Sequence, residues 1–157
     1  MVFQSYALFP HMTVFDNIGY GLRARKDRRV SRAVLTDRVT RMMEIAGLAG
    51  LGRRYPRQLS GGQQQRVAVA RALVTRPSIV FADEPTGNLD SRSGAELLAF
   101  LRRAVTELGQ TMVMVTHDPK AALVGDRIIF LRDGRHGGTV EAGDPRARTA
   151  IESFVGV

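Results

Sequence analysis

The chain has 157 residues, of which 44% are hydrophobic and 24% are charged, and it contains no cysteine. This length is typical of one globular domain with a real core, and the lack of cysteine excludes disulfide bonds, thiolate metal sites and cysteine nucleophiles. The formal net charge is +8 but only 6% of the residues are aromatic, so we interpret the basic cluster within residues 23–32 as a solvated loop rather than a surface that stacks nucleic-acid bases.

The first segment predicts a strand end, a turn and a helix. Residues 2–3 are typical of a strand, Pro10 favours a turn, and Thr13 is a suitable helix N-cap. The apolar residues that follow recur at helical spacing, at Val14, Ile18 and Leu22.

A second amphipathic helix is predicted over residues 31–47, with Gly47 as the glycine that ends it. Its apolar face would comprise Val34, Leu35, Val39, Met42, Met43 and Ala46.

Residues 59–63 read Leu-Ser-Gly-Gly-Gln and predict the start of a third helix. Ser60 is a favoured N-cap, and Gln63 completes a capping box with it. Because Gly61 and Gly62 carry no side chain, we expect the first turn to be uncovered. Bare N–H groups at the positive end of a helix bind anions, phosphate above all. An ordinary capped helix with tolerated glycines is the alternative interpretation.

Two apolar segments predict buried parallel strands that end on polar side chains. Residues 78–82 lead into Asp83 and Glu84, and residues 111–116 lead into His117. The carboxyl end of a buried parallel strand opens onto a ligand crevice. Solvated strand ends and a structural histidine are the plainer interpretations.

A helix is predicted between these strands, with Ser91 or Ser93 as its cap and Gly109 at its end. Its apolar face would comprise Leu97, Leu98, Leu101, Val105 and Leu108.

The last part of the chain predicts a strand at 127–132, a hairpin turn at Asp133 and Gly134, and a weak return strand at 137–143. Residues 144–157 give no signal. Alternating strands and amphipathic helices predict an α/β fold with a mainly parallel sheet flanked by helices.

Residues 59–73 resemble, residue for residue, the signature motif of the ATP-binding cassette (ABC) ATPases and its continuation. Four further segments resemble other motifs of that family in the family's order. They are Gln4 with residues 8–10 (the Q-loop), residues 79–84 (Walker B), 86–90 (the D-loop) and 115–118 (the H-loop).

The resemblance implies metal and water chemistry around the strand ends. Asp83 and Gln4 would bind Mg²⁺, the aspartate largely through water because that ion keeps its hydration shell. Glu84 would polarise the attacking water, as a general base or by orienting it. Gln4 would also reach that water, and His117 would contact the γ-phosphate of ATP. Glu84, His117 and Gln4 are therefore the expected catalytic residues.

A second group of residues would act on a neighbouring subunit. In the family, the signature helix start and the D-loop contact ATP that is held by the opposite subunit of a dimer. This carries over to Ser60, Gly61, Gly62, Gln63 and Asp90, which we expect to bind ATP in this way.

The resemblance also implies a P-loop NTPase-like fold. A helical subdomain with the signature helix would cover about residues 14–75, an α/β core about 76–140, and a tail 141–157. The sequence contains no Gly-x-x-x-x-Gly-Lys-Ser/Thr phosphate loop (Walker A). We therefore expect an N-terminally truncated domain without its first strands, whose uncovered apolar sheet surface favours aggregation.

The implied function is that of the ATP-hydrolysing subunit of an ABC transporter, with ATP and Mg²⁺ as cofactors. Without a phosphate loop we expect no activity from this chain alone, so whether it is an enzyme stays open. An inactive remnant that binds a partner subunit, and a soluble ABC ATPase outside transport, are the alternatives.

The expected partners are a second ABC ATPase subunit and membrane permease subunits that meet the Q-loop region, with no nucleic acid. No apolar run reaches the roughly 18 residues of a membrane span, and the start of the chain lacks a signal pattern. We therefore expect a cytoplasmic location, peripheral on the inner face of the membrane. Residues 8–14 resemble importers whereas 86–90 and 115–119 resemble exporters, so the direction of transport and the substrate stay open.

Overall fold

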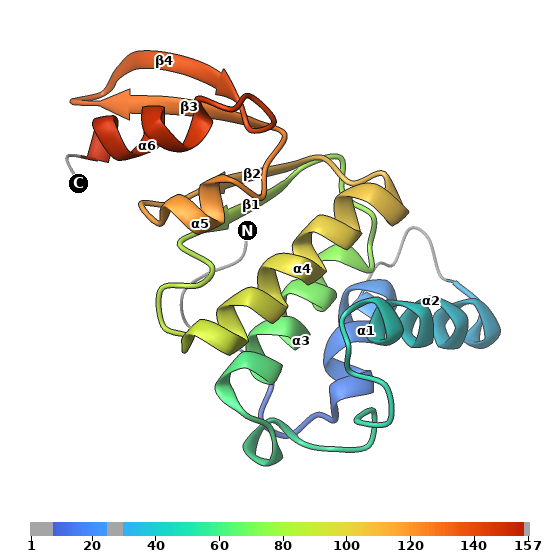
Figure 1. Cartoon of the computed structure of the whole chain (residues 1–157). Helices are drawn as coiled ribbons and strands as arrows, with labels where there is room; N and C mark the ends of the chain where they lie inside the picture. The colour runs from blue at the N-terminus through green and yellow to red at the C-terminus, as the bar shows by residue number, and fades with distance from the viewer. Residues whose placement is uncertain (1–7, 25–29, 156–157) are drawn as a thin grey trace.

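The computed structural model describes residues 8–24 and 30–155 (Figure 1). Their elements in chain order are α1 (Val14–Ala24), α2 (Arg32–Ile45), a 3₁₀ turn (Pro56–Gln58), α3 (Gly61–Leu73), β1 (Val80–Asp83), α4 (Ser91–Leu108), β2 (Met112–Val115), α5 (Pro119–Ala122), β3 (Arg127–Arg132), β4 (Arg135–Glu141) and α6 (Ala147–Val155).

The core forms around α3, which packs between α1 on one side and α4 on the other (Figure 1). Most of this helix is buried, including all six residues from 65 to 70. Apolar side chains from the neighbouring helices close around it. They include Val14 and Ile18 of α1, Val39 of α2, and Leu97 and Leu101 of α4. The predicted apolar face of α1 is therefore confirmed.

Two small sheets complete the fold and confirm the α/β class. β1 pairs in parallel with β2, with Val80 opposite Met112 and Asp83 opposite Val115. β3 and β4 form an antiparallel hairpin, with an irregularity between Phe130 and Leu131. In Figure 1 this hairpin lies beside α6, at the opposite end of the molecule from α2.

Three of the predicted helix boundaries are confirmed by their hydrogen bonds or backbone geometry. The Thr13 hydroxyl accepts from the N–H of Asp16 at 3.1 Å, and the Ser31 hydroxyl accepts from the N–H of Val34 at 3.3 Å. Gly109 ends α4 in the left-handed conformation, with φ of 63°. The predicted apolar face of α2 is wrong at Val34, whose 41% exposure places it on the solvent side.

The prediction of fully buried strands is wrong for one face of the β1–β2 sheet. Val80 and Ala82 are buried, but Phe81 is 53% exposed and Val115 is 59% exposed. Side chains alternate between the two faces of a strand, and no described residue covers the second face. An apolar run on both faces is typical of a parallel strand that is covered on both sides.

The end of the chain differs from the prediction in two respects. The return strand β4 begins at Arg135, two residues before the predicted start. The segment that gave no signal contains α6, whose Ala147 and Ile151 are buried one turn apart. The Phe154 ring lies 4.7 Å from the Phe130 ring between centroids, which joins α6 to the hairpin.

A buried asparagine holds the turn that leads into α1. The Asn17 side chain has no exposed surface. Its oxygen accepts from the N–H of Phe9 at 2.9 Å. Its amino group donates to the carbonyls of Phe9 and Met12 at 3.1 Å and of Thr13 at 3.0 Å. One side chain thus bonds four backbone groups of residues 9–13, of which the carbonyls of Phe9 and Thr13 also accept from backbone N–H groups.

The starts of α3 and α4 approach so closely that only a glycine fits between them. A Cβ atom built on Gly62 would lie 2.7 Å from both Cβ and Oγ of Ser93. This contact also corrects the expectation of an uncovered first turn, because Gly61 is exposed whereas Gly62 is buried.

We predict that Gly62→Ala lowers the free energy of unfolding by about 1–3 kcal/mol, because the added methyl group overpacks this contact. Urea denaturation measures the change. Adding Ser93→Gly removes both clashing atoms, so the double variant should lose less stability than the sum of the two single variants. Strict additivity would contradict the close contact.

We predict that Asn17→Leu lowers the free energy of unfolding by about 1–3 kcal/mol, since it removes the side-chain partner of the Phe9 N–H and of the Met12 carbonyl. Asn88→Leu, at an exposed position, is the matched control and should change stability by less than about 0.5 kcal/mol. Equal effects of the two substitutions would show that the Asn17 hydrogen bonds contribute little.

Candidate functional site

The predicted capping box at the start of α3 is confirmed. The Ser60 hydroxyl accepts from the N–H of Gln63 at 3.3 Å, and the Gln63 side-chain oxygen accepts from the N–H of Ser60 at 3.0 Å. Ser60 has extended backbone angles, φ −66° and ψ 161°, as an N-cap requires. Ser60 and Gly61 are exposed, so this helix start can be reached by a ligand or a partner.

The end of β1 carries the two carboxylates that the sequence singled out. Asp83 is exposed. Glu84 follows in the positive-φ region, at 41°, which is uncommon for a residue with a side chain. The N–H of Glu84 donates to the carbonyl of Val115 at 2.9 Å, and the Glu84 carbonyl accepts from Gly87 at 3.1 Å. The backbone turn at Glu84 is therefore held by hydrogen bonds on both sides.

The parallel pairing brings Glu84 and His117 together although 33 residues separate them. One carboxylate oxygen, Oε1, lies 2.7 Å from the ring Nδ1 of His117 and accepts from the His117 backbone N–H at 3.0 Å. The hydrogen bond with this carboxylate raises the pKa of the His117 imidazole. The His117 side chain is 85% exposed, so its second ring nitrogen stays accessible to a ligand.

Thr116 is a member of this cluster that the sequence analysis missed. Its hydroxyl donates to Oε2 of Glu84 at 3.2 Å and accepts from the N–H of Asp118 at 3.0 Å. The position of Thr116, directly before His117, is the signal that could have identified it.

Asp90, and neither of the two serines that we expected, caps α4. The Asp90 carboxylate accepts from the N–H groups of Arg92 at 3.1 Å and Ser93 at 3.0 Å. Ser91 is instead the first residue of the helix. The hydrogen bond from the Ser93 backbone is the main reason why the pKa of Asp90 is lowered, so the cap is negatively charged at neutral pH.

The structure brings together only part of the predicted site. Glu84 and His117 are in contact, but among the described residues no hydrogen bond joins them to Ser60 or Gln63. Gln4, which the resemblance assigns to the metal and the water, lies outside the described residues.

The donor set near the carboxylates suits a hard cation rather than a transition metal. No group of three or more His, Cys, Asp or Glu side chains in residues 8–24 and 30–155 is arranged to hold a metal ion. Mg²⁺ is commonly held by one or two protein carboxylates and completes its shell with water or phosphate oxygens. The exposed Asp83 carboxylate fits this mode of binding.

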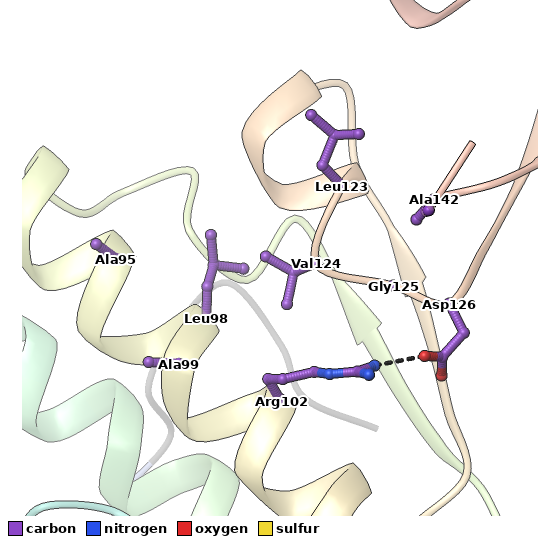
Figure 2. Close-up of a pocket in the computed structure, with 10 residues that line it drawn as sticks. Ala95, Leu98, Ala99, Arg102, Leu123, Val124, Gly125, Asp126 and Ala142 are labelled. Atoms are coloured by element: carbon purple, nitrogen blue, oxygen red, sulfur yellow. Dashed lines mark hydrogen bonds and ion pairs between the residues drawn. The ribbon is translucent and has the colours of Figure 1, made fainter. Parts of the chain in front are cut away.

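A separate groove of about 740 Å³ lies between α4 and the segment that leads into β3 (Figure 2). Its walls are mostly small or apolar, including Leu98 and Val124, and an ion pair of 2.6 Å joins Arg102 to Asp126 on one side. None of the predicted site residues lines it.

Comparisons with known proteins agree with the motifs. Residues 1–87 match the family model described as ABC transporter. The chain is 47% identical to the sulfate/thiosulfate import ATP-binding protein of Gloeobacter violaceus, over 99% of this chain and 45% of that protein. It is 45% identical to the Fe(3+) ions import ATP-binding protein of Rhizobium etli, over 99% of this chain and 44% of that protein.

A third relative is the trehalose/maltose import ATP-binding protein of Thermococcus litoralis, 44% identical over 99% of this chain and 42% of that protein. The chain thus spans less than half the length of these relatives. Among solved structures, the dimeric bacterial ABC transporter cassette MJ0796 matches with a TM-score of 0.74 and 39% identity, over 90% of this chain and 61% of that chain. The chain therefore belongs to the ABC transporter family, among its ATP-binding cassettes.

Proposed function

We propose that this chain works in the ATP-hydrolysing subunit of an ABC importer, where ATP hydrolysis powers transport across a membrane. The observation that carries the proposal is the contact between Glu84 and His117 at the ends of two paired parallel strands. The three relatives named above support import, since each is an import protein by name.

We propose that the carboxylate cluster acts on metal and water. Asp83 would hold Mg²⁺, which when bound neutralises charge on phosphate oxygens. Glu84 would accept a hydrogen bond from the attacking water and orient it. His117 would donate from its free ring nitrogen to the γ-phosphate. Gln4, outside the described residues, is assigned to the same metal and water.

The start of α3 is proposed to act on ATP that a second ABC ATPase subunit holds. Ser60, Gly61 and Gln63 would present hydroxyl, backbone and amide donors to the γ-phosphate, and Gly62 would add only its backbone. Asp90 would orient the 86–90 segment toward that subunit. In this arrangement the phosphate loop that holds the ATP belongs to the second subunit.

We assign residues 14–75 to a helical subdomain, 76–140 to the α/β core and 141–157 to a tail. Permease subunits are the proposed partners of the turn at residues 8–13. No helix among residues 8–24 and 30–155 is long and apolar enough to cross a bilayer. We propose that the subunit lies on the inner face of the membrane through these partners.

We predict that the chain associates with a complete ABC ATPase subunit in the presence of ATP and Mg²⁺, and that Ser60→Arg weakens this association at least about tenfold. A hydrogen bond to a charged group contributes about 1.5–3 kcal/mol, and about 1.4 kcal/mol of binding free energy corresponds to a factor of ten in the dissociation constant. Sedimentation of the chain with the sulfate/thiosulfate import subunit of Gloeobacter violaceus measures the affinity.

Ser31→Arg is the matched control, because Ser31 is also an exposed N-cap serine. Replacing it removes a similar N-cap hydrogen bond and should lower the free energy of unfolding by a similar amount, about 1 kcal/mol. It should leave the association unchanged. Association of the unmodified chain that does not depend on ATP would favour an inactive partner subunit, and no association at all would contradict the proposal.

We predict that the imidazole of His117 titrates above its usual pKa of about 6.5, and that Glu84→Gln lowers this pKa. Because the folded-state pKa is raised, the pair stabilises the folded chain fully below about pH 6.5, and this contribution is lost as the pH rises through the raised pKa. NMR titration of the His117 ring measures the shift. Glu96→Gln, which removes a carboxylate on α4, is the control, and equal midpoints in both variants would contradict the pairing.

A further inference from the structure

Three residues on one face of α3 contact three points of the segment that follows Glu84. Gly62 packs against Ser93. The Gln65 amino group donates to the carbonyl of Pro85 at 3.2 Å, in a buried hydrogen bond that spans 20 residues. Arg66 forms an ion pair with Glu96 of α4. Positions i, i+3 and i+4 share one face of a helix. The three contacts therefore hold this face of α3 against residues 85–96.

Gln65 is an unusual residue to find in this contact. It is only 2% exposed, and its side-chain oxygen has no hydrogen-bond partner among the described residues. A buried amide with an unpaired oxygen costs free energy that an apolar side chain of similar length would not. The feature of Gln65 that an apolar residue could not supply is the hydrogen bond to Pro85.

The Pro85 carbonyl lies directly after the strained Glu84. A positive φ on a residue with a side chain costs about 1–3 kcal/mol and persists only where the surroundings hold it. The entry to this turn is held by the bond from the Glu84 N–H to Val115 at 2.9 Å. On the exit side, Gln65 is the side chain that holds the Pro85 carbonyl.

We propose that Gln65 is a positioning residue that fixes the Glu84 carboxylate against His117. By holding Pro85 from within α3, it also makes the anion-binding start of α3 and the Glu84 carboxylate of the same chain move as one unit. The relevance of this coupling to hydrolysis rests on the proposed function, which assigns Glu84 to the attacking water. The coupling itself is a property of this chain without nucleotide.

The test replaces Gln65 by methionine, which keeps the length of the side chain but cannot donate a hydrogen bond. Gln64→Met is the matched control, because within the described part of the chain the Gln64 amino group donates to the carbonyl of Leu59, at 3.3 Å, just before its own helix. The readout is NMR of the His117 backbone N–H, which donates to Glu84. The N–H of Val74, bonded to Ala70 in α3, reports on global stability.

Gln65→Met should speed the hydrogen exchange of the His117 N–H about fivefold relative to that of Val74, the factor that corresponds to one net hydrogen bond. It should also shift the His117 N–H resonance in the direction that Glu84→Gln shifts it. Gln64→Met should change neither. Equal acceleration at His117 and Val74 would mean a merely structural contact, and no change at His117 would also overturn the proposal.

Gln65→Leu is the second variant, since its apolar side chain also fills the buried position but cannot donate a hydrogen bond to Pro85. It should reproduce the loss at His117. If neither variant folds, Gln65 is a core residue and the positioning role is refuted. The readout needs no ATP, so the two experiments are independent. If the unmodified chain does not associate with a complete subunit, the proposed function is refuted but this coupling is not decided. If Gln65→Met leaves His117 unchanged, the coupling is refuted but the proposed function is not decided.

Discussion

The close approach of two helix starts determines the geometry of the site. α3 and α4 meet at Gly62 and Ser93, where a single added carbon would lie 2.7 Å from its neighbour. Both helices present the positive ends of their dipoles here, which repel each other. The ionised Asp90 cap places a negative charge at the start of α4 and offsets this repulsion. The turn at Ser60, where we propose that an anion binds, and the carboxylate turn at Glu84 are both attached to this contact.

Features set by neighbouring residues could be predicted from the sequence. The capping box of Ser60 and Gln63 and the terminal Gly109 depend on hydrogen bonds and backbone angles within one turn, and they are confirmed. The cap of α4 was assigned wrongly because three capping residues lie within four positions, and local preference does not rank them. The short helix α6 was missed because its buried face contains few residues, among them Ala147 and Ile151.

Features set by distant residues could not be predicted in the same way. The apolar runs of β1 and β2 indicate strands, but they do not tell which face the rest of the described chain covers, and Phe81 and Val115 are exposed. The resemblance named Glu84 and His117 separately, whereas their contact depends on the register that places Asp83 opposite Val115. The roles of Thr116 and Gln65 could not be read from local sequence preference, because each contributes through a partner more than 15 residues away, at 3.2 Å in both cases.

The hydrogen bonds around Glu84 anchor its carboxylate without saturating it. An ionised carboxylate has about four acceptor positions. The nitrogens of His117 occupy two on Oε1, and the Thr116 hydroxyl occupies one on Oε2. Among the described residues no second donor contacts Oε2, and the proposed function would place the attacking water there, oriented by the three bonds already made. A carboxylate held in this way needs no rearrangement to orient water, and preorganisation of this kind is what makes electrostatic catalysis effective. The positive φ of Glu84 is the conformational cost of this arrangement, and the contacts from Val115 and Gln65 offset it.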